Sequence, residues 1–163
     1  MNPIVIVPAR MASMRLPDKP LADIHGKPMI VHVMDRAAEA DVGPVLCAAA
    51  EIKIISAVKN AGYKAVLTDP DHPSGSDRIW EALCAEDPNG SYDVIVNLQG
   101  DLPTLDPSLV TAVVTPLSNP DVDIATLVSE ITENNERDNP NVVKCVAALD
   151  DGRAHARALY FTR

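Results

Sequence analysis

The chain has 163 residues and a formal net charge of -9, from 14 Lys and Arg against 23 Asp and Glu. This acidity argues against non-specific nucleic-acid binding, and charged residues interrupt every apolar stretch that could span a bilayer. The hydrophobic fraction is 47% and the aromatic fraction only 3%, so aliphatic side chains must build the core. This composition favours one α/β domain over residues 1–163, with neither a nucleic acid nor a membrane as partner.

Three cysteines, Cys47, Cys84 and Cys145, lie too far apart in the sequence to form a metal or redox motif. They are expected to be buried thiols in a reducing compartment. The N-terminus has no positive segment ahead of an apolar stretch, so it does not resemble a signal peptide. These features predict a cytoplasmic protein.

Strands and helices are expected to alternate along the chain, because short apolar runs are separated by segments with helical periodicity. The expected strands are residues 4–7, 44–48, 64–67 and 92–98. The expected helices are residues 27–40, 51–61, 77–86 and 107–117. Weaker strand candidates are residues 123–128, 142–147 and 158–161, and the polar segment 132–141 is expected to be an exposed connection.

Such alternation predicts a right-handed parallel sheet with helices on both faces. Ligands of these sheets bind beyond the carboxyl ends of the strands. Three polar loops are expected to come out at that edge: residues 8–21, 68–78 and 99–103. Their convergence indicates a nucleotide site more strongly than the first loop does by itself.

The loop after the first strand groups Arg10, Ser13, Arg15 and Lys19 in a chain where cations are scarce. A basic pocket in an acidic protein favours a small anion over a long polyanion, and these side chains would suit a triphosphate. The alternative is a solvated surface loop. Neither G-x-x-x-x-G-K-[ST] nor G-x-G-x-x-G follows the first strand, so side-chain cations and loop amides would have to bind the phosphates.

Asp101 follows Gly100 at the end of an apolar strand, where a carboxylate can hold Mg²⁺ together with water and phosphate oxygens. The alternative is an Asp that caps the turn before Pro103. Gln99 could bind a sugar hydroxyl or merely brace its loop. No Ser/His/Asp or Cys/His pairing is visible, so covalent catalysis has no support.

The small polar loop 71–78 could read the edge of a base through backbone groups and hydroxyls. Ser76 could equally be only a helix cap, and Arg78 only a partner for Asp77. His72 has no second ligand at helical or strand spacing, which favours a surface or turn position. Lys144 and Arg163 could be solvated charges or cations for an anionic second substrate.

Several runs, in order along the whole chain, resemble those of the 3-deoxy-manno-octulosonate cytidylyltransferases, the CMP-Kdo synthetases. The matching runs are Arg10-x-x-Ser13-x-Arg15-Leu16-Pro17-x-Lys19-Pro20-Leu21, Gly26-Lys27-Pro28-Met29-Ile30, and residues 71–78, 97–101, 139–144 and 158–163. The resemblance implies a Rossmann-like nucleotide-diphospho-sugar transferase fold with a mostly parallel central sheet. It also implies Mg²⁺-dependent transfer of CMP from CTP to Kdo for lipopolysaccharide biosynthesis, with release of pyrophosphate.

The resemblance also implies roles for individual residues. The expected catalytic residues are Arg10, Lys19 and Asp101, and Asp101 would bind Mg²⁺. The expected sugar-binding residues are Gln99 near the sugars and Arg163 at the Kdo carboxylate. The expected nucleotide-binding residues are Pro8, Ala9, Arg10, Ser13, Arg15, Lys19, Ser74, Gly75, Asp77 and Arg78.

The chain departs from the family pattern at Ala48-Ala49-Ala50, where polar or acidic residues are usual, and at Leu102, where Glu is usual. The resemblance further implies that the chain lacks a C-terminal third with a second metal-binding Asp and most of the Kdo pocket. A homodimer is expected for the full-length protein. If nothing follows Arg163, we expect weak CTP binding and little turnover. The open alternatives are another sugar acid, of amino-Kdo or sialate type, and a non-catalytic CTP-binding module.

Overall fold

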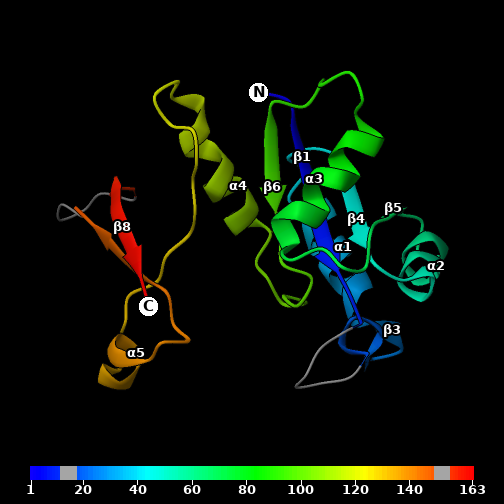
Figure 1. Cartoon of the computed structure of the whole chain (residues 1–163), viewed down its shortest axis with the longest axis horizontal. Coiled ribbons are helices and arrows are strands. Elements are labelled where there is room, and N and C mark those ends of the chain that lie inside the picture. Colours follow the sequence, from blue (N-terminus) through cyan, green and yellow to red (C-terminus); the bar gives the residue numbers. More distant parts are fainter. Residues whose placement is uncertain (12–17, 149–154) are drawn as a thin grey trace.

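A parallel sheet forms the centre of the computed structural model, which describes residues 1–11, 18–148 and 155–163 (Figure 1). Its four strands have the order β5-β4-β1-β6. They are β1 (Pro3–Ala9), β4 (Val45–Ala49), β5 (Lys64–Leu67) and β6 (Val94–Asn97). Every pairing between them is parallel, so the predicted parallel sheet is confirmed. The strand order reverses between β1 and β6, and ligands bind at such a switch point.

Helices cover both faces of this sheet, because alternate side chains of β1 point to opposite sides. Val5 and Val7 pack with one cluster that includes buried residues of α1 (Met29–Glu39), α2 (Ile52–Asn60) and α4 (Ser108–Val114). Ile4 and Ile6 pack against α3 (Gly75–Glu86) on the other face. Each residue of this strand centre is at most 1% exposed, and burying such a side chain stabilises the fold by about 1.5–3 kcal/mol.

The segment between β1 and α1 contains small elements that were not predicted: residues 19–21 were expected in a loop and residues 27–28 at the start of a helix. A 3₁₀ helix, η1 (Lys19–Leu21), is followed by the short antiparallel pair β2 (Asp23–Ile24) and β3 (Lys27–Pro28). His25 and Gly26 form the turn of this pair with φ values of 52° and 81°, as a tight hairpin turn requires. The helix therefore begins at Met29, because Lys27 and Pro28 pair with β2.

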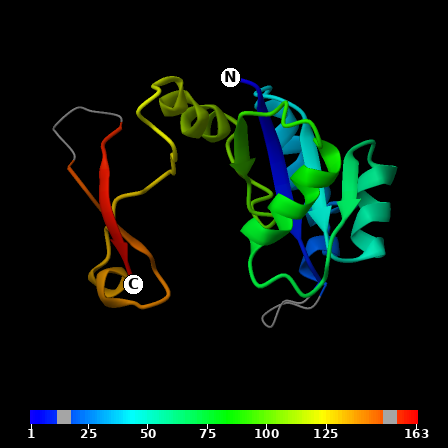
Figure 2. The same cartoon turned by 45° about the horizontal axis from the view of Figure 1, so that its top comes forward.

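The segment after the 3₁₀ helix η2 (Thr115–Ser118) lies beside the parallel sheet rather than in it (Figures 1 and 2). It contains the short helix α5 (Asn134–Asp138) and an antiparallel pair, β7 (Lys144–Ala147) and β8 (Ala158–Thr162). The two strands expected near these positions are thus confirmed, but they pair with each other. The predicted strand at residues 123–128 is wrong, since these residues form no strand in the structure and Ile124 is 87% exposed.

The three cysteines are free thiols with different environments. Cys47 is buried in β4, and burial raises the pKa of its thiol to about 12. Cys145 is half-buried and Cys84 is exposed on α3, so the expectation of three buried thiols is wrong for Cys84. Within the described ranges, no helix combines the length and hydropathy needed to cross a membrane.

Candidate active site

The loops that follow β1, β5 and β6 meet at the carboxyl edge of the sheet, as the sequence predicts. Pro8, at the end of β1, lies between Gly75 at the start of α3 and Gly100 just after β6. A Cβ atom on Gly75 would lie 3.5 Å from Pro8 Cγ, an ordinary contact. A Cβ atom on Gly100 would lie only 2.7 Å from the carbonyl oxygen of Pro8. The first and third loops can therefore approach this closely only because residue 100 has no side chain.

We expect Gly100→Ala to lower the free energy of unfolding by about 1–3 kcal/mol, the usual range for overpacking a closed site. Urea unfolding followed by circular dichroism measures this change. Gly75→Ala is the matched control, because the new methyl group would also face Pro8 but at an ordinary distance. Its stability should stay close to that of the unchanged protein. Equal stability of the two variants would contradict the close approach of these loops.

Lys19 and Asp101, two of the predicted catalytic residues, form an ion pair across this edge. The Lys19 Nζ donates to Asp101 Oδ2 at 2.7 Å, although the residues are 82 positions apart. Lys19 belongs to η1 after β1, and Asp101 follows β6, so the pair spans the switch point of the sheet. The side chains are 33% and 51% exposed. An ion pair this exposed contributes at most about 1 kcal/mol, so both groups can exchange their partner for a ligand.

The carboxylate of Asp101 suits Mg²⁺ that arrives with a nucleotide. Mg²⁺ in phosphate-transfer sites is often held by one or two carboxylates, with substrate phosphates and water filling its other positions. No cluster of three or more His, Cys, Asp and Glu residues occurs in the part of the chain that the structure describes. A single carboxylate such as Asp101 fits a metal whose other ligands are substrate phosphates and water.

The start of the basic loop is held by a residue that the sequence analysis did not single out. The Met11 N–H lies 3.1 Å from each carboxylate oxygen of Glu51, the residue before α2. Glu51 comes two residues after the end of β4, at the carboxyl edge of the sheet. This place in the sequence could have indicated that Glu51 belongs to the site. Arg10, beside this contact, is exposed. Ser13 and Arg15 lie outside the described residues, so their triphosphate roles stay predictions.

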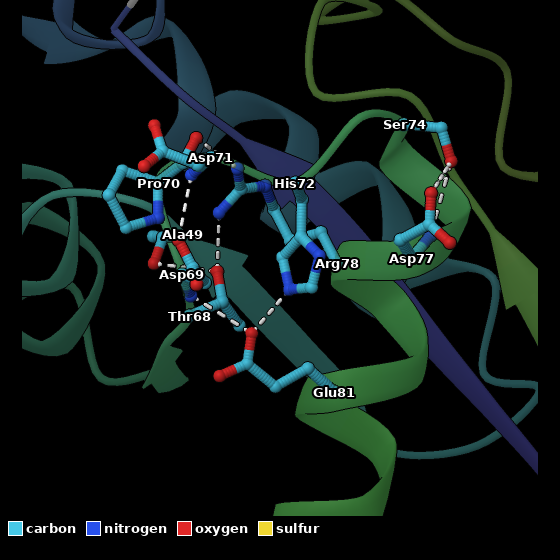
Figure 3. A network of polar contacts seen from close by, with 10 residues as sticks. All are labelled: Ala49, Thr68, Asp69, Pro70, Asp71, His72, Ser74, Asp77, Arg78 and Glu81. Carbon is cyan, nitrogen blue, oxygen red and sulfur yellow. Dashed lines mark hydrogen bonds and ion pairs between the residues drawn. The ribbon is translucent and has the colours of Figure 1, made fainter.

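The N-terminus of helix α3 is capped by Ser74 and not by Ser76, the alternative that the sequence allowed (Figure 3). The Ser74 Oγ accepts from the Asp77 N–H at 3.2 Å and donates to Asp77 Oδ2 at 2.5 Å. Asp77 is thus paired with Ser74 and not with Arg78. Ser74, Gly75 and Asp77 are exposed, and their contacts with a nucleotide stay predictions.

Arg78 differs from the other expected nucleotide-binding residues because it is only 2% exposed. Its Nη1 donates to Thr68 Oγ1 at 2.5 Å and its Nη2 to the Pro70 carbonyl at 3.4 Å. The buried guanidinium therefore holds the loop after β5 through Thr68 and Pro70. A direct contact between Arg78 and CTP stays a prediction.

The two expected sugar-binding residues have different surroundings. Gln99 Nε2 donates to Asn97 Oδ1 at 2.8 Å, which braces the end of β6. Arg163 is exposed at the C-terminus, which lies apart from the parallel sheet in both views (Figures 1 and 2). The structure does not bring Arg163 to Asp101. Lys144 donates to the carbonyl oxygens of Asn139 and Val142, both at 3.0 Å, so it supports the turn before β7.

This fold, with a cation and a carboxylate paired at the switch point, is an α/β fold of the kind that binds its ligand beyond the carboxyl ends of parallel strands. The chain belongs to the cytidylyltransferase family, whose family model matches residues 4–163. It is similar to the 3-deoxy-manno-octulosonate cytidylyltransferase of Rhodospirillum centenum, with 62% identity over 162 residues that cover 99% of this chain and 63% of that protein. The same enzyme of Paramagnetospirillum magneticum is 58% identical over 163 residues, which cover 100% of this chain and 66% of that protein.

Solved structures agree with this assignment. The structure of CMP:2-keto-3-deoxy-manno-octonic acid synthetase complexed with CTP matches with a TM-score of 0.83 and 36% identity, covering 99% of this chain and 64% of that one. 4-Diphosphocytidyl-2C-methyl-D-erythritol synthase has a TM-score of 0.62 at 10% identity and shows the shared fold alone. The predicted nucleotidyltransferase fold is confirmed. The chain spans just under two thirds of the length of the curated relatives named here.

Proposed function

We propose that this protein transfers CMP from CTP to Kdo, releasing pyrophosphate and giving CMP-Kdo, the activated sugar for lipopolysaccharide biosynthesis. The observation that carries the proposal is the pairing of Lys19 with Asp101 at the switch point. A cation for phosphate and a carboxylate for a divalent metal are the two groups that phosphate transfer needs side by side. The similarity to 3-deoxy-manno-octulosonate cytidylyltransferases supports cytosine as the base and Kdo as the acceptor.

In this reaction a hydroxyl oxygen of the sugar acid attacks the α-phosphorus of CTP in line. The bond from the α-phosphorus to its bridging oxygen breaks, and pyrophosphate leaves with that oxygen. Catalysis then depends mainly on positioning and charge neutralisation. Lys19 and Arg10 would stabilise negative charge on the α-phosphate, and Arg15 would steady the leaving pyrophosphate. The proton of the attacking hydroxyl passes to solvent water, so no side chain is needed as a general base.

Asp101 is the residue that would hold Mg²⁺. Bound there, Mg²⁺ would neutralise phosphate charge and favour the ionised form of the sugar hydroxyl. Lys19 donates to Asp101 Oδ2 in this structure, so its ammonium would have to turn away as that oxygen gains another partner. The ammonium would then be free to donate to a phosphate oxygen. Breaking the ion pair between Lys19 and Asp101 would thus free Lys19 for a phosphate oxygen and Asp101 for Mg²⁺.

The remaining roles follow from the edge on which the residues lie. The exposed residues Ser74, Gly75 and Asp77 would contact cytosine and ribose, and Gln99 would lie near the sugars. Arg163 would meet the Kdo carboxylate only with further rearrangement, because it lies apart from the parallel sheet (Figure 1). A cytoplasmic location is part of this proposal, supported by three cysteines that are free thiols.

A substrate panel on the complete gene product tests the proposal. CTP and Mg²⁺ are combined with Kdo, its amino-substituted analogue or a sialic acid, and pyrophosphate is followed with a coupled assay. We expect release that requires both CTP and Kdo. Release of pyrophosphate with another sugar acid but not with Kdo would show that the other acid is the acceptor. CTP binding without release for any acid would favour a non-catalytic CTP-binding module instead.

We also propose that the full-length protein is a homodimer, with the β7–β8 segment in the interface. Three neighbouring residues of β8, Leu159, Tyr160 and Phe161, are 53–61% exposed. Leu159→Asp should convert the dimer to a monomer in sedimentation equilibrium, because a buried unpaired charge opposes association. Ile52→Asp is the control, since Ile52 is 69% exposed on α2. A dimer that survives Leu159→Asp would place the interface elsewhere.

A further inference from the structure

Helix α3 holds the loop Thr68–Ser74 through a set of polar side chains (Figure 3). We call the pair Arg78 and Glu81 the α3 clamp. The two residues are three positions apart, so they lie next to each other on the surface of one helix. The helix itself is fixed to the sheet by Ile79, Ala82 and Leu83, which pack on Ile4 and Ile6. The clamp therefore connects the loop to the buried core.

Arg78 fixes the first part of the loop. Besides the bonds to Thr68 and Pro70, it reaches the sheet indirectly, because Thr68 Oγ1 donates to the Ala49 carbonyl at 3.1 Å. Thr68 is itself only 3% exposed. Hydrogen bonds between buried polar groups resist distortion, because breaking one of them leaves a buried donor or acceptor without a partner. These bonds join Thr68, just after β5, to Arg78 of α3 and to Ala49 of β4.

Glu81 fixes the middle of the loop. Its Oε2 accepts from the Asp69 N–H at 2.9 Å and pairs with His72 Nε2 at 2.5 Å. The hydrogen bond from the Asp69 amide, and then the one from His72, hold the pKa of Glu81 below its usual value. Glu81 therefore remains a charged acceptor through the neutral range. His72, which the sequence analysis expected at a surface or turn position, sits in this loop as the partner of Glu81.

We propose that Glu81 is a positioning residue that fixes the loop Thr68–Ser74, so that the exposed groups of the loop read the base of CTP. This inference rests on the proposed function. A loop that is ordered before the ligand arrives lowers the ordering cost of binding. Losing Glu81 should therefore weaken the binding of CTP and the discrimination between bases more than it slows the chemical step.

Three variants of the complete gene product test this role. Glu81→Ala removes the carboxylate oxygen that both Asp69 and His72 contact, while Glu81→Gln keeps an amide oxygen for the Asp69 N–H but loses the charge that faces His72. Glu86→Gln is the matched control, because Glu86 is on the same helix and pairs with Lys64 at the start of β5, away from the loop. We expect KM for CTP to rise about tenfold in Glu81→Ala, which loses both contacts, and about threefold in Glu81→Gln, which keeps the bond from the Asp69 amide.

In the same variants kcat should stay within about twofold, and the ratio of kcat/KM for CTP over UTP should fall about as much as KM rises. The Glu86→Gln control should match the unchanged protein. A merely structural residue would lower the amount of folded enzyme without changing this ratio. An unchanged CTP-to-UTP ratio in Glu81→Ala would overturn the proposal.

Hydrogen exchange without any ligand separates this inference from the proposed function. The Asp69 amide should exchange at least tenfold faster in Glu81→Ala than in Glu86→Gln, since its acceptor is gone. Unchanged exchange would show that Glu81 does not fix the loop, and the inference would fail whatever the enzyme turns over. Failure of the proposed function would show instead as absent pyrophosphate release in the unchanged protein.

Discussion

Lys19→Ala is expected to lower pyrophosphate release from CTP and Kdo by about 10²–10³-fold, the cost of removing one preorganised donor from a developing charge. Lys19 is the cation that the structure places across the switch point, 2.7 Å from Asp101. Its loss would leave the charge on the α-phosphate without a partner from η1. The measurement is steady-state pyrophosphate release at saturating CTP, so that the effect appears in kcat.

The fold should not change in this variant, because the Lys19 side chain is partly exposed and its ion pair contributes little to stability. Circular dichroism and the urea midpoint check this. Lys64→Ala is the matched control: Lys64 also forms an ion pair, with Glu86, and is 68% exposed, but it lies at the start of β5. Near-normal turnover in Lys19→Ala would remove Lys19 from the mechanism.

Asp101→Asn is expected to lower turnover by about 10²-fold or more and to weaken the dependence on Mg²⁺. An amide lacks the charge that attracts the cation, while its size keeps the strand end packed as before. Titration of Mg²⁺ against initial rate measures the change, and chelation with EDTA should stop the unchanged enzyme. The half-saturating Mg²⁺ concentration should rise in the variant.

The control for this substitution is Asp41→Asn, in the connection between α1 and β4. Asp41 has a φ of 50°, a conformation that Asn also tolerates, so the fold should be undisturbed. Because Lys19 and Asp101 are in contact, the double variant should lose less than the product of the single effects. Independent, fully multiplicative losses would indicate that the pair does not act as a unit. A variant Asp101→Asn with unchanged Mg²⁺ response would place the metal elsewhere.

Much of the central sheet could be predicted from local pattern. The run at residues 4–7 is wholly apolar, as in a parallel strand buried on both faces, and the strands at residues 64–67 and 92–98 are also short and bounded by turn residues. The helices between them are marked by apolar residues at helical spacing, such as Ile30, Val33 and Met34. The parallel arrangement follows because consecutive strands are joined by helices.

Residues 119–163 were less predictable for a physical reason. The stretch 123–128 has the composition of a strand, but a strand needs a partner for its backbone groups, and none of the described strands pairs with this stretch. The strands β7 and β8 form an antiparallel pair with each other and do not join the parallel sheet. Propensity can indicate an extended segment but cannot say which strand it pairs with.

The sequence by itself determined the kinds of groups present: a cationic loop after the first strand, a carboxylate after β6 and a small polar loop before α3. Each group follows a strand, and the carboxyl ends of parallel strands lie at the same edge of a sheet. The sequence therefore suffices to predict that these groups lie at one edge. Only the tertiary structure decided which groups touch. It paired Lys19 with Asp101, bound Glu51 to the Met11 amide and buried Arg78 beneath its loop. Those contacts join residues distant in the chain, and no local pattern carries their distances or directions.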